Sequence, residues 1–172
     1  VTLFKTEQKN SILNNARTAW VQTNATGVNT SDGIELSGSW KPVNKKISLN
    51  LGYTFTDSYD AATCDPDEKA AYADSECRDI GSKVQSAKVR VPRHSIQSKI
   101  NYNISANLKG SLKGKYVGEA RDFGNANNSY TDVILTDYFV FDLETSYQLF
   151  DGYKIFANIG NILDEEYEQA YQ

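Results

Sequence analysis

The sequence of 172 residues contains no apolar run that approaches the roughly 18 to 20 residues of a membrane-spanning helix, which excludes helical membrane spans. It contains no concentrated basic patch and has a net charge of −4, which argues against electrostatic binding of nucleic acid. No segment at its N-terminus resembles a signal peptide, and its first residues already have the pattern of a strand. We therefore expect the sequence to be part of a longer chain.

Histidine is equally scarce, which restricts the available chemistry. The one histidine, His94, precedes Ser95, and a Ser and a His on a barrel wall would suggest a hydrolase. Adjacent residues of a strand face opposite sides of the sheet, so these two side chains cannot act together as base and nucleophile. With no second histidine we expect no catalysis, no zinc site and no bound cofactor. We interpret His94 as a residue at the membrane interface or at the start of a strand.

The only two cysteines, Cys64 and Cys77, lie in one polar segment rich in Asp, Glu and Ala. A disulfide between them, formed in an oxidising compartment, would stabilise the fold by about 3 kcal/mol in the chain-entropy model. Two unpaired thiols are the alternative. A calcium site is a further alternative for this segment, but the spacing of its carboxylates fits no EF-hand loop, and a solvated loop is favoured. The carboxylates belong to Asp57, Asp60, Asp65, Asp67, Glu68, Asp74, Glu76 and Asp79.

What the sequence does contain is a strict alternation of charged and uncharged residues. In residues 108–119 every charged side chain falls on one parity, and a β-strand turns successive side chains to opposite faces. Of about 30 positions on the uncharged parity none is charged, although roughly 7 would be at the average charged fraction of 23%. Charge is therefore sorted by face. The same separation recurs in residues 34–40, 47–55, 96–104, 139–149 and 153–159.

This sorting predicts an all-β protein, an antiparallel transmembrane β-barrel whose outer face meets lipid and whose inner face meets a polar lumen. A mean hydropathy of −0.54 would suggest a soluble domain, but a barrel confines its apolar residues to every second position. Eleven Tyr, seven Phe and two Trp are consistent with aromatic girdles at the two membrane interfaces. The alternative is a soluble β-sandwich such as a lectin, which also alternates but uses its apolar face for a shared core.

About seven strands are predicted, at residues 1–8, 28–41, 46–57, 89–103, 107–121, 134–149 and 152–163. Short connections are expected at residues 42–45, 104–106 and 151–152, and long ones at 9–27, 58–88 and 122–133. Tight turns at one end and long loops at the other are typical of outer-membrane barrels, whose tight turns face the periplasm. Because bacterial barrels close with an even number of strands, we expect further wall beyond one or both ends of this sequence.

Four short motifs occur in order on the predicted strands. Residues 161–168 (NILDEEYE) resemble the signature N-L-hydrophobic-D-K-x-Y that precedes the last strand of TonB-dependent outer-membrane receptors. Residues 33–36 (GIEL), 51–57 (LGYTFTD) and 91–94 (VPRH) are similar to three further motifs of that family. The resemblance covers nearly the whole sequence. It implies that residues 1–172 are the C-terminal part of a 22-stranded barrel, with the plug domain and the final strand outside it.

The resemblance also implies energised uptake of a scarce large nutrient, a cobalamin or a ferric siderophore, across the bacterial outer membrane. Extracellular loops would capture the nutrient, and a TonB-type energy-transducing protein acting through the plug would release it inward. Outer-membrane lipid and lipopolysaccharide would surround the barrel. Residues 116–121 (YVGEAR) look most like cobalamin receptors, some of which use loop calcium held by strands upstream of this part. The alternative is a passive porin or adhesin wall, which needs neither plug nor energised partner.

Candidate ligand contacts are the aromatic residues expected on loop-forming segments, Tyr59, Phe123 and Tyr130. No catalytic residue is expected. A polar inner lining that pairs across strands or holds the plug is expected from Lys99, Lys113, Lys115, Glu119, Asp142 and Glu144. Small lipid-facing positions beside aromatic neighbours are expected at Gly110, Gly114 and Gly118.

Overall fold

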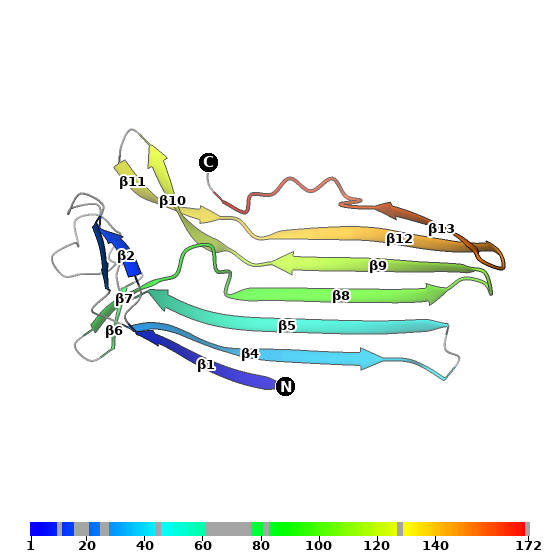
Figure 1. Cartoon of the computed structure of the whole chain (residues 1–172), viewed down its shortest axis with the longest axis horizontal. Helices are drawn as coiled ribbons and strands as arrows, with labels where there is room; N and C mark the ends of the chain where they lie inside the picture. Colours follow the sequence, from blue (N-terminus) through cyan, green and yellow to red (C-terminus); the bar gives the residue numbers. More distant parts are fainter. Residues whose placement is uncertain are drawn as a thin grey trace.

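The computed structural model describes residues 1–9, 12–15, 21–24, 28–43, 46–60, 77–80, 83–126 and 129–170. Within these ranges every regular element is a strand, and no helix is long and apolar enough to cross a membrane. Seven strands lie side by side in one antiparallel sheet, which two short strands, paired at the end of the third strand, extend to nine; this confirms the predicted partial antiparallel architecture (Figure 1). In sheet order they are β1 (Thr2–Lys9), β4 (Val28–Trp40), β5 (Ile47–Asp60), β8 (His94–Asn103), β9 (Leu108–Val117), β12 (Tyr138–Phe150) and β13 (Tyr153–Ile159).

The two ends of the sheet differ, as predicted. At one end short connections join β4 to β5, β8 to β9 and β12 to β13, and the last of them places Gly152 at φ +87° (Figure 1). At the other end the chain forms three hairpins in segments that we expected to be loops. Their strands have four to seven residues and lack the regular alternation of apolar and polar residues by which the other strands were recognised. The hairpins are β2 (Ile12–Asn15) with β3 (Val21–Asn24), β6 (Cys77–Ile80) with β7 (Lys83–Ala87), and β10 (Ala120–Ala126) with β11 (Ser129–Leu135).

One predicted strand begins later than expected. The strand expected over residues 89–103 starts at His94, and the five residues before it form a bend. Arg90 there adopts a left-handed conformation, with φ +59°, and Pro92 has no amide hydrogen to donate to a neighbouring strand. The bend leaves the hairpin end of the wall irregular.

Three further boundaries also differ from the prediction. The strands expected over residues 107–121 and 134–149 each divide in two, because the chain leaves the main sheet between them to form the β10–β11 hairpin. The strand expected over residues 152–163 ends at Ile159. Asn161 has φ +49°, a left-handed conformation that a strand cannot continue through.

The strand register separates two faces across the whole main sheet. Leu112 of β9 lies between Ile100 of β8 and Leu143 of β12, all three uncharged. The next residue, Lys113, points to the other side and lies opposite Lys99. The predicted sorting of charge by face is thus confirmed, and we call the two sides the uncharged face and the charged face.

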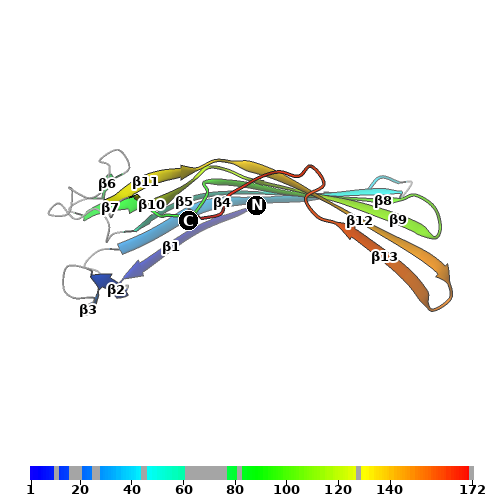
Figure 2. The ribbon, with the colours of Figure 1, turned by 90° about the horizontal axis from the view of Figure 1, so that it is seen from above.

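The main sheet is a single arched layer (Figure 2). Among the described residues only three apolar side chains are buried, those of Tyr59, Leu135 and Tyr138. Large apolar side chains of the uncharged face are exposed instead, among them Trp40 at 58% and Leu51 at 50%. A soluble sandwich would bury this face against a second sheet, so the single layer favours the membrane barrel.

Aromatic side chains of the uncharged face gather at two levels. Trp40, Tyr102 and Tyr147 lie near the tight turns, whereas Tyr116 and Phe139 lie toward the hairpins with their ring centroids 4.5 Å apart. The strands β8 and β9 have 10 residues each, which is the length that crosses a bilayer. In the register of β9, Tyr102 and Tyr147 lie opposite Gly110 and Leu108, six and eight residues from Tyr116, and two aromatic levels at this separation match the girdles of a membrane barrel.

Of the three glycines predicted to face lipid, two lie in β9 and one follows it. Gly110 and Gly114 lie on the uncharged face opposite the aromatic residues Tyr102 and Phe141, as predicted. Gly118 instead lies beyond the end of β9 and is buried, and its backbone N–H donates to the carbonyl oxygen of His94 at 2.8 Å. Its small size therefore serves the contact between β8 and β9, not a lipid-facing position.

Gly33 of β4 fits a place where no side chain can be accommodated. A Cβ atom there would overlap the carbonyl oxygen of Phe55 on one side and the ring of Phe4 on the other. We expect Gly33→Ala to lower the free energy of unfolding by about 1 to 3 kcal/mol, because the backbone of β5 would have to move. Gly38→Ala, on the same strand with no atom within 4 Å of the new Cβ, is the matched control. Urea titration of both variants in lipid vesicles measures the difference, and equal stabilities would contradict the close approach.

Candidate functional site

The charged face has a cavity at its middle. A cavity of about 810 Å³ extends over five neighbouring strands, from β4 to β12. Its lining includes the small residues Ser37 and Gly52 and the lysines Lys99, Lys113 and Lys115. A sheet that encloses space on one face curves toward that face, so the charged face is the concave, inner one. The uncharged face is then convex and directed outward, as in a membrane barrel.

Three charged side chains of adjacent strands meet at the border of this cavity, which Lys99 and Lys113 line. Glu144 of β12 forms an ion pair with Lys113 of β9, and its Oε2 lies 3.7 Å from Nζ of Lys99 of β8. The side chains are 35 to 42% exposed, so each pair contributes less than about 1 kcal/mol to stability. The predicted pairing of the inner lining across strands is confirmed for these three residues.

The other members of the predicted lining are arranged differently. Asp142 accepts a hydrogen bond from the backbone N–H of Asn161 at 2.9 Å. Lys115 lines the cavity and forms no ion pair with another described residue. Glu119 was predicted in the same lining, but β9 ends at Val117, and Glu119 lines a separate cavity at the hairpin end.

A second cavity, of about 440 Å³, continues along the charged face toward the tight turns. Lys99 and Glu144 connect the two cavities, since Lys99 lines both and Glu144 contacts Lys99. Lys109 lines the second cavity, a residue that the predicted lining did not include although its parity places it on this face. Phe156 adds an exposed ring to this polar surface, with Nζ of Lys154 4.7 Å from the ring centroid.

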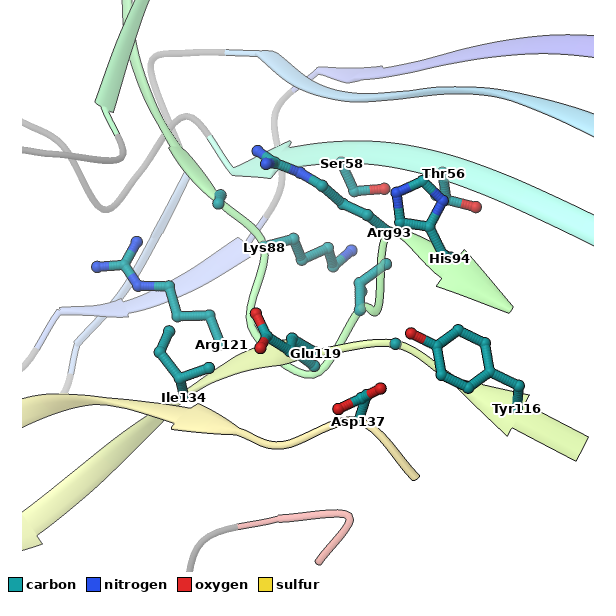
Figure 3. A pocket seen from close by; sticks show the side chains of 14 residues that line it. Thr56, Ser58, Lys88, Arg93, His94, Tyr116, Glu119, Arg121, Ile134 and Asp137 are labelled. Carbon is teal, nitrogen blue, oxygen red and sulfur yellow. The ribbon is translucent and has the colours of Figure 1, made fainter. Parts of the chain in front are cut away.

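A third cavity, of about 320 Å³, lies at the hairpin end, where the wall is irregular (Figure 3). Because β8 begins only at His94, the bend at residues 88–93 occupies the space between β5 and β9 on the hairpin side of β8. Lys88 and Arg93 line this cavity together with the carboxylates of Glu119 and Asp137 (Figure 3). Charges of both signs surround it, so the cavity has no evident preference for an anion or a cation.

Ion pairs and hydrogen bonds fix the bend beside this cavity. Nε of Arg90 donates to both carboxylate oxygens of Asp122, at 2.9 and 3.0 Å, and the Asp122 side chain is only 1% exposed. Nε of Arg93 lies 3.5 Å from Oδ1 of Asp57, and its Nη2 donates to the Tyr59 hydroxyl at 3.2 Å. The residues of each pair are more than 30 positions apart, and no sequence pattern indicated them.

His94 is held on the uncharged face. Its Nδ1 lies 2.9 Å from the Tyr53 hydroxyl, within hydrogen-bond distance, and its ring centroid lies 5.3 Å from that of Phe55. Ser95 lies opposite Thr54 on the charged face. The predicted position of His94 at the start of a strand is confirmed, and the two side chains point away from each other as expected.

The three aromatic residues predicted to contact ligand are not in loops. Tyr59 lies in β5 and is 8% exposed, with its hydroxyl accepting the hydrogen bond from Arg93. Phe123 and Tyr130 lie in the paired strands β10 and β11. The expected loop location was wrong because β5 continues as far as Asp60 and because β10 and β11 pair with each other in a hairpin. A role in ligand contact stays a prediction for all three.

The predicted disulfide and acidic segment lie largely outside the described residues. Cys77 is in β6, but Cys64 is outside the described ranges, so the disulfide stays a prediction. Asp57, the first of the acidic residues, forms the ion pair with Arg93. Across the part of the chain that the structure describes, no group of three or more His, Cys, Asp or Glu side chains is arranged to hold a metal ion. Calcium binding by the acidic segment therefore stays untested.

The motif at residues 161–168 forms a compact turn after β13. Nδ2 of Asn161 donates to the carbonyl oxygen of Glu165, and Oδ1 of Asn161 accepts from the backbone N–H of Glu165, both at 3.0 Å. The backbone N–H of Asn161 donates to Asp142 on β12. One side chain thus closes the turn, and a carboxylate of the wall fixes its start.

The same segment packs against the first half of β12, the half nearer the hairpins. The backbone N–H of Ile162 donates to the carbonyl oxygen of Phe141 at 2.8 Å. The rings of Tyr167 and Tyr138 are stacked, with centroids 4.3 Å apart and planes at 18°. Beyond the end of β13, this segment therefore takes the place of a strand beside β12, and we call residues 161–167 the C-terminal clasp (Figure 1).

Comparison with known families gives one clear match. The family model described as "TonB dependent receptor-like, beta-barrel" matches residues 1–162. No curated protein sequence matches the chain.

Solved structures with a similar fold include three receptors described below. The chain is 18% identical to the ferric-catecholate import receptor Fiu of E. coli K12, with a TM-score of 0.66 over 98% of this chain and 21% of that one. It is 17% identical to the pyoverdine outer-membrane receptor FpvA of Pseudomonas aeruginosa PAO1, with a TM-score of 0.69 over 98% and 23%. It is 19% identical to the siderophore receptor PiuA of Acinetobacter baumannii, with a TM-score of 0.65 over 98% and 22%. The chain spans about a fifth of the length of these receptors, and identities this low show the shared fold alone.

Proposed function

Because this chain belongs to the TonB-dependent receptor-like β-barrel family, we propose that it forms part of the barrel wall of a receptor that takes up a ferric siderophore. The family match over residues 1–162 carries the proposal. The similar structures include a receptor for ferric catecholates and one bound to pyoverdine, which supports an iron chelate as the cargo. The lysine-lined cavity on the inner face supports an anionic cargo in particular.

Uptake in this proposal is energised by a TonB-type protein that acts through a plug domain outside the chain. The receptor lies in the bacterial outer membrane, where its family members lie, with the uncharged face in contact with lipid. The hairpin end lies outside the cell and captures the cargo, and the tight turns lie in the periplasm. The aromatic level near the hairpins then adjoins lipopolysaccharide, a partner that this proposal includes.

Two other functions receive less support. Uptake of cobalamin is supported by the tyrosine-rich strands and by the likeness of residues 116–121, a segment that crosses from β9 to β10 beside the cavity of about 320 Å³. None of the three similar structures named above is a cobalamin receptor. A passive porin or adhesin wall would require no plug, whereas the matching family is that of TonB-dependent receptors. A ferric siderophore is therefore the favoured cargo, with cobalamin as the comparison.

An uptake assay in whole cells tests this function. Cells that produce the full-length receptor are expected to accumulate radiolabelled iron supplied as a ferric tris-catecholate, whereas cells without it are not. A protonophore, or deletion of the TonB-type protein, is expected to return accumulation to background. Accumulation that persists without energy would support the passive wall instead, and uptake of labelled cyanocobalamin but not of iron would replace the proposed cargo.

A further inference from the structure

The buried side chains of this chain gather at the hairpin end of the sheet. Six of the described side chains are buried, although the main sheet is a single layer with large apolar side chains exposed. They belong to Ser58 and Tyr59 near the end of β5, Arg121 and Asp122 of β10, Leu135 at the end of β11 and Tyr138 at the start of β12. Parts of the receptor outside the chain can only cover these side chains further, so their burial requires no partner from elsewhere. The hairpin end thus has a small core of its own, and we call these six residues the hairpin core.

The bend at residues 88–93 is hydrogen-bonded to the hairpin core on two sides. The backbone N–H of Lys88 donates to the carbonyl oxygen of Ser58 in β5 at 2.9 Å. The backbone N–H of Arg90 donates to the carbonyl oxygen of Arg121 in β10 at 2.7 Å. The strands β5 and β10 do not pair with each other, so the bend links two strands that the sheets leave separate.

Each side of the bend leads to one hairpin. On the first side, β7 directly precedes the bend, and its Ala87 pairs with Tyr59 of β5. On the second side, β10 and β11 form a separate two-stranded sheet, in which Asp122 pairs with Val133. Sheet pairing therefore fixes the β6–β7 hairpin to the wall but does not fix the β10–β11 hairpin. Both hairpins lie at the same end of the wall (Figure 1).

The side chain of Arg90 adds a charged contact to the backbone hydrogen bond between the bend and β10. Its Nε donates to both carboxylate oxygens of Asp122, at 2.9 and 3.0 Å, and the Asp122 side chain is 1% exposed. Charge-assisted hydrogen bonds are stronger than neutral ones, and more so away from water. Arg90 also has φ +59°, a left-handed conformation that is unfavourable for a residue with a Cβ atom. Such a conformation persists only where surrounding contacts hold it, and the contacts of Arg90 with Arg121 and Asp122 do so.

We propose that Arg90 is a positioning residue that joins the β6–β7 and β10–β11 hairpins into one unit, whose fixed arrangement captures the cargo. The joining of the hairpins rests on the contacts above, and the role in capture rests on the proposed function. A binding surface that is already ordered loses less conformational entropy when it binds, so its affinity is higher. Arg90 acts through the hairpins and does not itself need to touch the cargo.

The test measures amide hydrogen exchange of the full-length receptor in a bilayer, without cargo. Asp122→Asn weakens the pair from the β10 side, and Arg90, which is 54% exposed, stays solvated, so the variant is expected to fold. Exchange is expected to be at least about tenfold faster both in residues 120–126 and in residues 83–87 of the other hairpin. Residues 109–116 of β9 are expected to exchange at the wild-type rate. Arg90→Gln weakens the pair from the side of the bend and is expected to give the same pattern.

Binding of ferric tris-catecholate to the same variants tests the role in capture. The dissociation constant is expected to rise about tenfold in Asp122→Asn and in Arg90→Gln, because both hairpins must then be ordered on binding. The number of chelates bound per receptor at saturation is expected to stay the same. Lys41→Gln removes an exposed positive charge at the tight-turn end of the wall and is expected to change neither exchange nor binding.

The exchange pattern decides whether the hairpins are joined. Faster exchange in residues 120–126 alone after Asp122→Asn overturns the inference, because the hairpins would then move independently. Wild-type exchange in both hairpins also overturns it, and so does faster exchange throughout β9, because the pair would then support the whole wall. Faster exchange in both hairpins with an unchanged dissociation constant overturns the role in capture. A wild-type receptor that binds no ferric chelate overturns the proposed function, whereas the joining of the hairpins is measured without cargo.

Discussion

Replacement of Leu112 by lysine is expected to lower the free energy of unfolding of the full-length receptor in a bilayer by about 2 to 4 kcal/mol. Leu112 lies at the middle of β9, and its neighbours Ile100 and Leu143 share the uncharged face. In a membrane the new ammonium would lie near the midplane of the hydrocarbon core, where no water solvates it. Reversible urea unfolding in lipid vesicles, followed by tryptophan fluorescence, measures the change.

Thr54→Lys is the matched control for this substitution. Thr54 lies on the charged face of β5, directly opposite Glu35 of β4. A lysine there faces the polar lumen beside a carboxylate, so we expect a change of less than about 1 kcal/mol. Equal losses in the two variants would show that the uncharged face does not meet lipid, and the assignment of the two faces would be wrong.

Replacement of Asn161 by alanine is expected to lower the free energy of unfolding by about 2 to 4 kcal/mol. The substitution removes both hydrogen bonds between the Asn161 side chain and the backbone of Glu165. It also places alanine at φ +49°, a left-handed conformation that asparagine tolerates better. Opening of the C-terminal clasp would expose the first half of β12, the half nearer the hairpins. The fraction of folded receptor and its urea midpoint measure the effect.

Two further substitutions separate the causes. Asn161→Gly tolerates the left-handed conformation and loses only the side-chain hydrogen bonds, so we expect it to cost about 1 to 2 kcal/mol. Glu166→Ala changes an exposed residue of the same segment and is expected to have no measurable effect. If Asn161→Ala is no less stable than Glu166→Ala, the clasp does not contribute to the stability of the wall.

The sequence was sufficient to predict the main sheet because its cause is local. A face that meets lipid excludes charge from every second position, so the shared parity of Lys109, Lys113 and Lys115 was enough to place all three on one face. The strands β1 and β4 were predicted to within about one residue of their observed ends, and most errors elsewhere were at boundaries. The hairpins were missed because their strands lack a regular alternation, since they lie outside the part of the wall that the bilayer constrains.

The site could be predicted only in part, because its contacts join distant residues. The pair of Arg90 and Asp122 and the stacking of Tyr138 on Tyr167 depend on how irregular segments fold back on the sheet. The C-terminal motif was recognised from its residues, but its physical role was not. In the structure the motif's Asn161 closes a turn, and its Tyr167 packs on the wall, which gives a reason for both residue types.

The separation of the two faces also explains how one thin sheet can combine contact with lipid and a polar inner surface. The outer face needs only to be free of charge, whereas the inner face can carry lysines, carboxylates and cavities without disturbing the contact with lipid.

Lipid contact along β9 is the most direct test of this interpretation. Spin labels are attached one at a time to cysteines introduced at residues 108 to 116 of the full-length receptor in a bilayer, with Cys64 and Cys77 replaced by serine. Collision with dissolved oxygen, which concentrates in lipid, is then measured for each label. We expect high collision rates at the even-numbered positions and low rates at the odd-numbered ones, a period of two over the whole strand. Rates that do not alternate, or that are high at Lys113 and low at Leu112, would contradict the assignment of the uncharged face to lipid.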